Sequence, residues 1–94
     1  MKRYVYLEKK DGDIIAHHMT ATNRQEVKEK TGACIDNIYS KDLLVKVNNW
    51  LRKSGQELVF SDEIFVYIKN KNGNIHYMYS FVEFRNIVSE YRER

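Results

Sequence analysis

Aromatic and branched residues near the start of the chain form two short runs that flank an Asp-Gly pair. Residues 4–7 read YVYL and residues 14–19 read IIAHHM, with the Asp-Gly pair between them. Such side chains suit a pleated strand, and Asp-Gly is typical of a two-residue turn with positive φ. The pattern predicts a β-hairpin in which Tyr6 faces His17.

The same pattern returns later in the chain. Residues 4–14 read YVYLEKKDGDI and residues 65–75 read FVYIKNKNGNI, and the two align without a gap at an offset of 61 positions. The second copy contains Asn-Gly, the strongest short hairpin signal in this sequence. A two-residue turn at this pair predicts a second hairpin in which Ile68 faces Tyr77.

One helix is expected directly after each hairpin. After the first hairpin, Thr22 and Gln25 fit a capping box and Gly32 is a suitable left-handed stop, so a short helix lies between them. After the second hairpin, Ser80 and Glu83 form a similar box. The apolar side of the last helix has residues at spacings of three and four: Phe81, Phe84, Ile87, Val88 and Tyr91.

The segment between these two units is predicted to be one long helix that starts near Ala33 and ends at the RKSG sequence. Its apolar residues recur at spacings of three and four: Ile35, Tyr39, Leu43, Val47, Trp50 and Leu51. Leu44 and Val45 fall outside that face. A strand over LLVKV, or a break near Ser40, therefore stays open.

Together these elements predict an α+β fold with the order ββα–α–(β)–ββα, in which the bracketed strand is the ELVF sequence. We expect a single domain over residues 1–94, with a hairpin–helix unit at 1–32, a central helix at 33–55 and a second hairpin–helix unit at 56–94. The hairpins should join in an antiparallel sheet covered by three helices, because an isolated hairpin is unstable. Internal duplication and independent origin of the two units both remain open.

Composition and charge limit the function. The 94 residues carry a formal net charge of +3, far from the loading of a dedicated nucleic-acid binder. Residues 43–55 contain three cations and no acid, and so form a local basic patch: Lys46, Arg52 and Lys53. The first residues lack the apolar stretch of a signal peptide, and the longest apolar run, residues 64–68, is too short to span a membrane. With a single cysteine, Cys34, we expect a protein of the reducing cytoplasm.

The sequence TNRQEVKEKTGACIDNIYSKDL resembles a helix-turn-helix. Gly32 follows Val27 by five positions, and Ile38 lies six positions beyond the glycine. Together with the preceding hairpin, the stretches TNRQEVKEKTG and NIYS are similar to small proteins of phages and plasmids in low-GC bacteria, over about the first 45 residues. The resemblance implies a binding protein of phage or mobile-element type.

The same segment offers an alternative function, a DNA-binding transcriptional regulator. Its second helix would present four polar residues to bases or phosphates: Asn37, Tyr39, Ser40 and Lys41. The segment also carries Asp36 and Asp42, and their negative charge disfavours contact with phosphates. A helical hairpin that packs without touching DNA is therefore favoured over DNA recognition.

No catalytic, metal-binding or cofactor-binding motif stands out. His17 and His18 are adjacent on a predicted strand and so point to opposite faces, and neither His76 nor Cys34 belongs to a paired Cys or His spacing. A nucleophile needs a base and an orienting group, and none lies nearby in the sequence. We expect no enzymatic activity, no metal and no cofactor, and we expect the Cys34 thiol to be packed.

Tyrosine is the most distinctive residue type, since the chain has seven Tyr, four Phe and one Trp. Tyr and Trp are enriched at protein interfaces. We predict a non-catalytic protein that docks on a host protein or a protein–nucleic-acid complex as an anti-defence inhibitor of the anti-CRISPR kind, and a homodimer stays open. The candidate contact residues are tyrosines of the hairpins and nearby cations: Tyr4, Tyr6, Tyr67, Lys69, Lys71, Lys46, Arg52 and Lys53.

The two hairpin tips differ in charge. The first tip has Glu8, Asp11 and Asp13 beside two lysines. The second tip has asparagines in place of both aspartates, which leaves Lys69 and Lys71 unopposed. An anionic partner should therefore contact the second tip.

Overall fold

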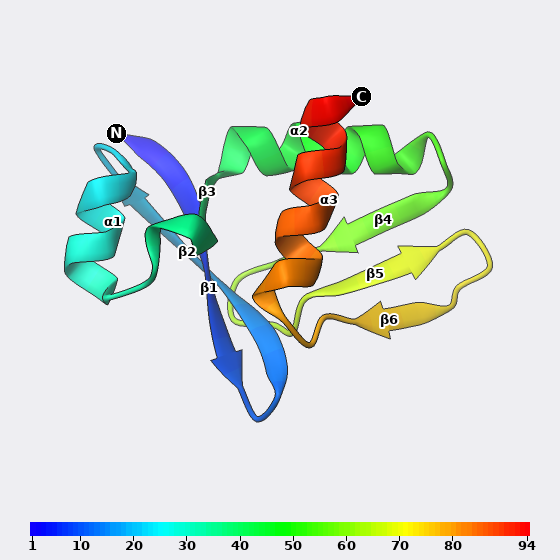
Figure 1. Cartoon of the computed structure of the whole chain (residues 1–94), viewed down its shortest axis with the longest axis horizontal. Helices are drawn as coiled ribbons and strands as arrows, with labels where there is room; N and C mark the ends of the chain where they lie inside the picture. Colours follow the sequence, from blue (N-terminus) through cyan, green and yellow to red (C-terminus); the bar gives the residue numbers. More distant parts are fainter.

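The computed structural model describes residues 1–94 and has an α+β fold with three helices and two three-stranded antiparallel sheets (Figure 1). The first sheet, in the order β2-β1-β3, contains β1 (Lys2–Lys10), β2 (Asp13–Ala21) and β3 (Ile38–Ser40). The second sheet, in the order β4-β5-β6, contains β4 (Gln56–Val59), β5 (Tyr67–Asn70) and β6 (Ile75–Tyr77). The helices are α1 (Arg24–Thr31), α2 (Lys41–Arg52) and α3 (Phe81–Glu93), with a short 3₁₀ turn, η1, at Ile35–Asn37. The predicted fold class is confirmed, as is a strand at ELVF.

The first hairpin has the predicted register, with Tyr6 opposite His17. Its turn residues Asp11 and Gly12 have φ angles of 52° and 88°. Positive φ at both central positions is the geometry of a type I′ turn, which explains why Asp-Gly occupies this site.

The prediction of one helix over residues 33–55 is wrong. Ile38 and Tyr39 are both buried although they are adjacent, and they belong to β3, which pairs with β1. A strand buries adjacent residues on opposite faces, whereas a surface helix does not. Ser40 then caps α2 by accepting a 3.2 Å hydrogen bond from a backbone N–H of the first turn. The break near Ser40, which the sequence had left open, is therefore present.

The register predicted for the second hairpin is wrong by one residue, because Tyr77 pairs with Tyr67 and not with Ile68. The Asn70 side chain accepts hydrogen bonds from the backbone N–H groups of Asn72 and Asn74, at 2.9 and 3.0 Å. These bonds stabilise a three-residue loop in place of a two-residue turn. A shift of one residue moves side chains to the other face, so Tyr67 and Tyr77 now share one face.

The two hairpins belong to separate sheets, but a short contact joins them. Ile15 of β2 forms an antiparallel bridge with Phe65, and the Val66 N–H donates to the Ile14 carbonyl at 2.8 Å. The segment before β5 thus continues the first sheet beyond β2. As a result, the two sheets share an inner side and an outer side.

The helix caps follow the sequence closely, with one difference. Asn23, and not Thr22, is the N-cap of α1, and its side chain accepts from the Glu26 N–H at 2.9 Å. The Glu26 carboxylate in turn accepts from the Thr22 backbone N–H and hydroxyl, and the backbone hydrogen bond is the main reason that the pKa of Glu26 is lowered. Gly32 ends α1 in the left-handed conformation and Ser80 caps α3, both as predicted.

The main core lies between the inner side of the sheets and helices α2 and α3, and α3 crosses α2 near the C-terminus (Figure 1). The predicted apolar side of α3 is confirmed, since Phe84 and Val88 are buried and its other members pack around them. Leu44, which was expected to lie off the apolar face of α2, is buried. A smaller cluster lies under α1 on the other side of the first sheet: Tyr4, Ala21, Val27 and Ile38.

A buried asparagine of α2 covers the free edge of β4. The Asn48 Nδ2 donates to the Leu58 carbonyl at 3.1 Å, and its Oδ1 accepts from the Leu58 N–H at 2.9 Å. These bonds satisfy backbone groups that no neighbouring strand pairs, and they hold α2 beside the sheet. None of the three helices is both long and apolar enough to cross a membrane.

Candidate functional site

The outer side of the second sheet carries aromatic residues that remain exposed. Val66 and Met78 are buried in the main core. Side chains alternate along a strand, so Tyr67 and Tyr77, which flank these two residues within β5 and β6, point to the opposite, outer side. The register of the second hairpin places Tyr67 opposite Tyr77 there, with ring centroids 5.5 Å apart. Tyr79 follows β6, and its ring lies 5.9 Å from that of His76.

We call this surface the outer aromatic face and define it as Phe65, Tyr67, Ile75 and Tyr77. Three of its members are 40–48% exposed, and Tyr67 is half-buried between its neighbours. A contiguous exposed patch of apolar and aromatic side chains is typical of an interaction surface.

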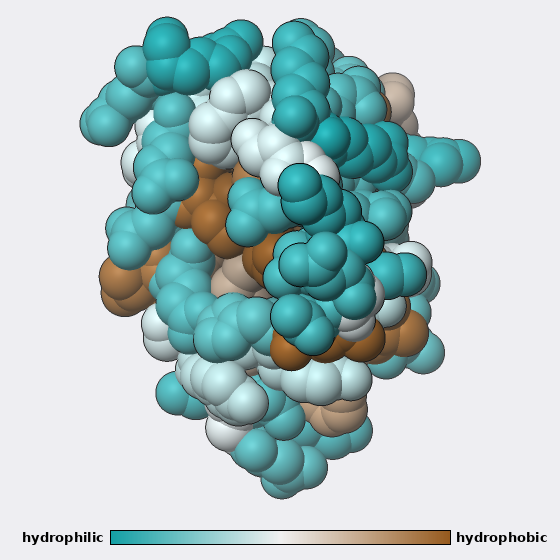
Figure 2. Space-filling view, turned by 90° about the vertical axis from the view of Figure 1, so that its right-hand side faces the viewer, coloured by the Kyte–Doolittle hydropathy of each residue, from teal (hydrophilic) through white to brown (hydrophobic).

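Three predicted contact residues gather at one end of this face. Arg52, Lys69 and Lys71 line an open hollow between the α2–β4 turn and the β5–β6 loop. Arg52 pairs with Glu57 at 3.3 Å, whereas the two lysines have no acidic partner. Figure 2 views the molecule from this end and shows hydrophobic residues recessed within a ring of hydrophilic ones.

The other two predicted cations lie outside that hollow. Lys46 is exposed on α2, and Lys53 is the exposed C-cap residue of the same helix. Of the predicted basic patch, the hollow therefore contains Arg52 alone, and its other cations are Lys69 and Lys71.

The two N-terminal tyrosines differ in exposure. Tyr4 is only 5% exposed and packs with Val27 beneath α1, so its predicted contact role is wrong. The cause is that α1 covers this side of the first hairpin near its open end. Tyr6 lies farther along the same side, is half-buried and stacks on His17 with ring centroids 4.9 Å apart.

The end of the outer side near Tyr6 is acidic. Burial raises the pKa of Tyr6, and three neighbouring carboxylates raise it further: Glu8, Asp62 and Glu63. The outer side is thus basic beside Lys69 and Lys71 and acidic beside Tyr6.

The residues predicted for DNA recognition do not form a recognition helix. Asn37 ends the 3₁₀ turn, Tyr39 and Ser40 belong to β3, and Lys41 begins α2. Asn37 and Tyr39 are 5% and 7% exposed, so their side chains cannot enter a groove of DNA in this conformation. Three of the four residues instead contribute to a different site.

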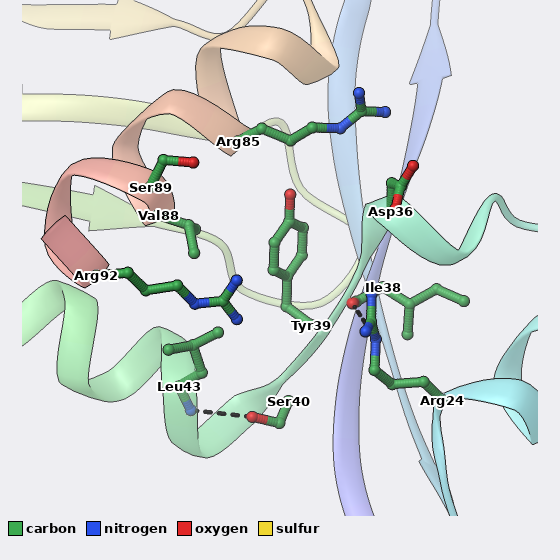
Figure 3. Close-up of a pocket in the computed structure, with 10 residues that line it drawn as sticks. All are labelled: Arg24, Asp36, Ile38, Tyr39, Ser40, Leu43, Arg85, Val88, Ser89 and Arg92. Atoms are coloured by element: carbon green, nitrogen blue, oxygen red, sulfur yellow. Dashed lines mark hydrogen bonds between the residues drawn. The ribbon is translucent and has the colours of Figure 1, made fainter.

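That site is a pocket of about 360 Å³ around Tyr39 (Figure 3). Three arginines line it, Arg24 from α1 and Arg85 and Arg92 from α3, and Asp36 is its only acid. The formal charge of the lining is therefore +2. The other lining residues are Ile38, Ser40, Leu43, Val88 and Ser89.

Hydrogen bonds fix two of the arginines. Arg85 donates from Nη2 to Oδ1 of the buried Asn37 at 3.0 Å. Arg24 donates from Nε to the Ile38 carbonyl at 3.0 Å. The guanidinium groups are therefore held in place before any ligand arrives.

Two buried donors of the pocket have no hydrogen-bond partner in the protein: the Tyr39 hydroxyl and the Arg85 Nε. Burial raises the pKa of Tyr39, although nearby Arg85, Arg24 and Arg92 act in the opposite direction. The hydroxyl therefore stays protonated at neutral pH and is able to donate.

No group of three His, Cys, Asp or Glu side chains is close enough to hold a metal ion. His17 and His18 point to opposite sides, as predicted: His17 lies 3.3 Å from Glu8, and His18 Nε2 lies 2.7 Å from the Phe60 carbonyl. Cys34 is exposed, so the prediction of a packed thiol is wrong. It is the N-cap residue of the short 3₁₀ turn η1.

The three arginines of the pocket were not predicted from the sequence, because α1 and α3 are far apart in the chain and meet only around β3. One local signal was available. Arg85, Ser89 and Arg92 are spaced by four and three residues, which places them on one face of a helix.

No protein-family model, curated protein or solved structure matches this chain. Its function is therefore inferred from the outer aromatic face, the basic hollow and the arginine pocket.

Proposed function

We propose that this protein is a non-catalytic binding protein that docks onto a partner protein through the outer aromatic face. The observation that supports this is the exposure of Phe65, Ile75 and Tyr77 together on one side of a sheet whose other side is buried. Aromatic side chains bury a large area at low entropic cost when they dock. Removing such surface from water is worth about 25 cal/mol per Å².

The distribution of charge supports one kind of partner. Lys69 and Lys71 lie at one end of the face without an acidic partner, and carboxylates cluster near Tyr6 at the other end. Complementary charges steer encounter and fix orientation. The proposed partner is therefore a folded protein whose apolar patch is bordered by carboxylates where it meets the two lysines.

The phage-type resemblance supports a biological setting for this interaction. In that setting the partner is a bacterial host protein, alone or within a protein–nucleic-acid complex, and docking inhibits a defence function. No structural observation favours the DNA-binding regulator over this proposal.

Capture from a bacterial lysate with the full chain as bait, followed by direct binding to the purified captured protein, tests the proposal. Phe65→Ser combined with Tyr77→Ser should abolish binding. Val45→Ser should leave it intact, because Val45 is an equally exposed apolar residue on α2. Retained binding by the double variant, or equal loss with Val45→Ser, would contradict docking through this face.

The charge complementarity has its own test. Lys69→Gln combined with Lys71→Gln should slow association with the purified partner and weaken its dependence on salt. Lys46→Gln should change the association rate and its salt dependence less, because Lys46 lies outside the basic hollow.

A further inference from the structure

We propose that the pocket around Tyr39 binds a phosphoryl group, either inorganic phosphate or the terminal phosphate of a phosphate monoester. Tyr39 points to the inner side of the first sheet, since it pairs with the core residue Val5. The pocket is therefore separate from the outer aromatic face, and its proposed ligand does not depend on the docking proposal.

The charge of the pocket favours a multiply charged anion. None of Arg24, Arg85 and Arg92 takes part in any of the four ion pairs of the protein. Three neighbouring guanidinium groups repel one another, and the single acid, Asp36, only partly offsets them. A bound dianion would neutralise the remaining formal charge of +2 and accept charge-assisted hydrogen bonds.

The directions of the donors favour a tetrahedral anion over a planar one. Figure 3 shows Arg24 and Arg92 on either side of the Tyr39 ring, and Arg85 extending past its hydroxyl from α3. A phosphate accepts hydrogen bonds from all sides, whereas a carboxylate accepts mainly in its own plane. Arginine is also the residue that best matches phosphate geometry.

The two unpartnered donors are the independent observation that points to a ligand. The Tyr39 side chain is buried, at 7% exposure, and both its hydroxyl and the Arg85 Nε lack an acceptor. Leaving buried donors unpaired is costly, so such groups call for an explanation. One phosphate bound between Arg85 and Arg92 would present oxygens to both donors.

Isothermal titration of the full chain with inorganic phosphate tests the site. Arg92→Gln should weaken binding at least about tenfold, and Tyr39→Phe about three- to tenfold, as expected for the loss of one charged and one neutral hydrogen bond. Arg94→Gln is the matched control, because it removes the same charge from the same end of the chain outside the pocket. Equal weakening by Arg92→Gln and Arg94→Gln would overturn the proposal.

A second substitution tests the sign of the electrostatic contribution. Asp36→Asn should tighten phosphate binding about two- to fivefold, because it removes the only acid of an exposed pocket rim. Weaker binding by this variant would contradict the assignment.

Ligand comparison separates the two sources of the phosphoryl group. Tighter binding of ribose 5-phosphate than of inorganic phosphate would assign the site to a monoester, and the reverse order would assign it to free phosphate. Acetate binding as tightly as phosphate at equal ionic strength would overturn the phosphoryl assignment. So would unchanged NMR signals of the Tyr39 ring and Arg85 Nε–H in millimolar phosphate.

Discussion

Buried polar side chains of this protein differ in whether their hydrogen bonds are satisfied. Asn48 makes two bonds to the backbone of Leu58, and its side chain thereby serves as a partner for the edge of β4. The Tyr39 hydroxyl is equally buried and has no partner in the protein. The Asn48 side chain should therefore stabilise the fold. The Tyr39 hydroxyl should instead bind a ligand, and its removal should cost the fold little stability.

Asn48→Ala should lower the free energy of unfolding by about 2–4 kcal/mol, because it removes two buried hydrogen bonds and leaves the Leu58 backbone unpaired. Urea denaturation measures the effect. The exposed neighbour Asn49 provides the control, because the only hydrogen bond of its side chain is with Arg52. Asn49→Ala should lower the free energy of unfolding by less than about 0.5 kcal/mol. Equal losses would mean that Asn48 does not hold α2 to β4.

Tyr39→Phe should leave the stability of the ligand-free protein unchanged or raise it by up to about 1 kcal/mol, because it removes an unsatisfied buried hydroxyl and keeps the ring. The ring contact with Phe84, at a centroid distance of 4.9 Å, is retained. Urea denaturation in phosphate-free buffer is the measurement. A loss of more than about 1 kcal/mol would assign the hydroxyl to the fold and not to a ligand.

The raised pKa of Tyr39 predicts a loss of stability at alkaline pH. Burial favours the protonated hydroxyl in the folded state, so the unfolded chain ionises first as pH rises past about 10. The free energy of unfolding is therefore at its full value below that pH and falls as pH rises toward the pKa of Tyr39 in the folded state. Unfolding free energies between pH 8 and about 11 should fall more steeply for the wild type than for Tyr39→Phe, and parallel curves would contradict the prediction. The pKa of Tyr6 is also raised, so the Tyr39→Phe variant should still lose some stability at alkaline pH.

At the scale of secondary-structure elements, local sequence predicted the first hairpin better than the second. Asp11-Gly12 forms the expected tight turn, and the register follows from it. The second hairpin contains Asn-Gly, but Asn70 bonds to two backbone N–H groups of the loop and changes the register by one residue. The deciding interaction is an Asx-turn bond from the Asn72 N–H to the Asn70 side chain, which the Asn-Gly pair alone does not predict.

The predicted central helix failed for a related reason. Tyr39 fits a helical period with Ile35 and Leu43, yet Ile38 and Tyr39 pair with β1, a strand far from them in the sequence. Tertiary pairing overrides local periodicity for such short segments. Ser80, by contrast, caps α3 through a local hydrogen bond from the Glu83 N–H, as the sequence predicted.

Asn70→Ala should destabilise the protein by about 1–2 kcal/mol, because two loop amides lose their acceptor. Asn72→Ala is the control, since no side-chain bond of Asn72 supports the loop, and it should change the stability by less than about 0.5 kcal/mol. Thermal or urea unfolding compares the two. If both variants unfold alike, the Asn70 side chain does not set the loop.

For the molecule as a whole, sequence analysis identified the fold class and part of the candidate surface. Lys69, Lys71 and Arg52 were predicted as contact residues and do gather at one end of the outer aromatic face. The sequence did not predict that Tyr67 and Tyr77 share one face, because this follows only from the observed register. The arginine pocket required the packing of α1 and α3 around β3, and the local spacing of Arg85, Ser89 and Arg92 indicates only one helix face of it.

The central claim is docking through the outer aromatic face, and site-specific photo-crosslinking tests it most directly. A photoreactive phenylalanine at position 65 or 77 should form a covalent link to one bacterial protein, because both side chains are exposed on that face. The same group at position 45, on α2, should not. Identical crosslinks from position 45, or crosslinks from 65 and 77 only to a second copy of this chain, would contradict the proposed interaction.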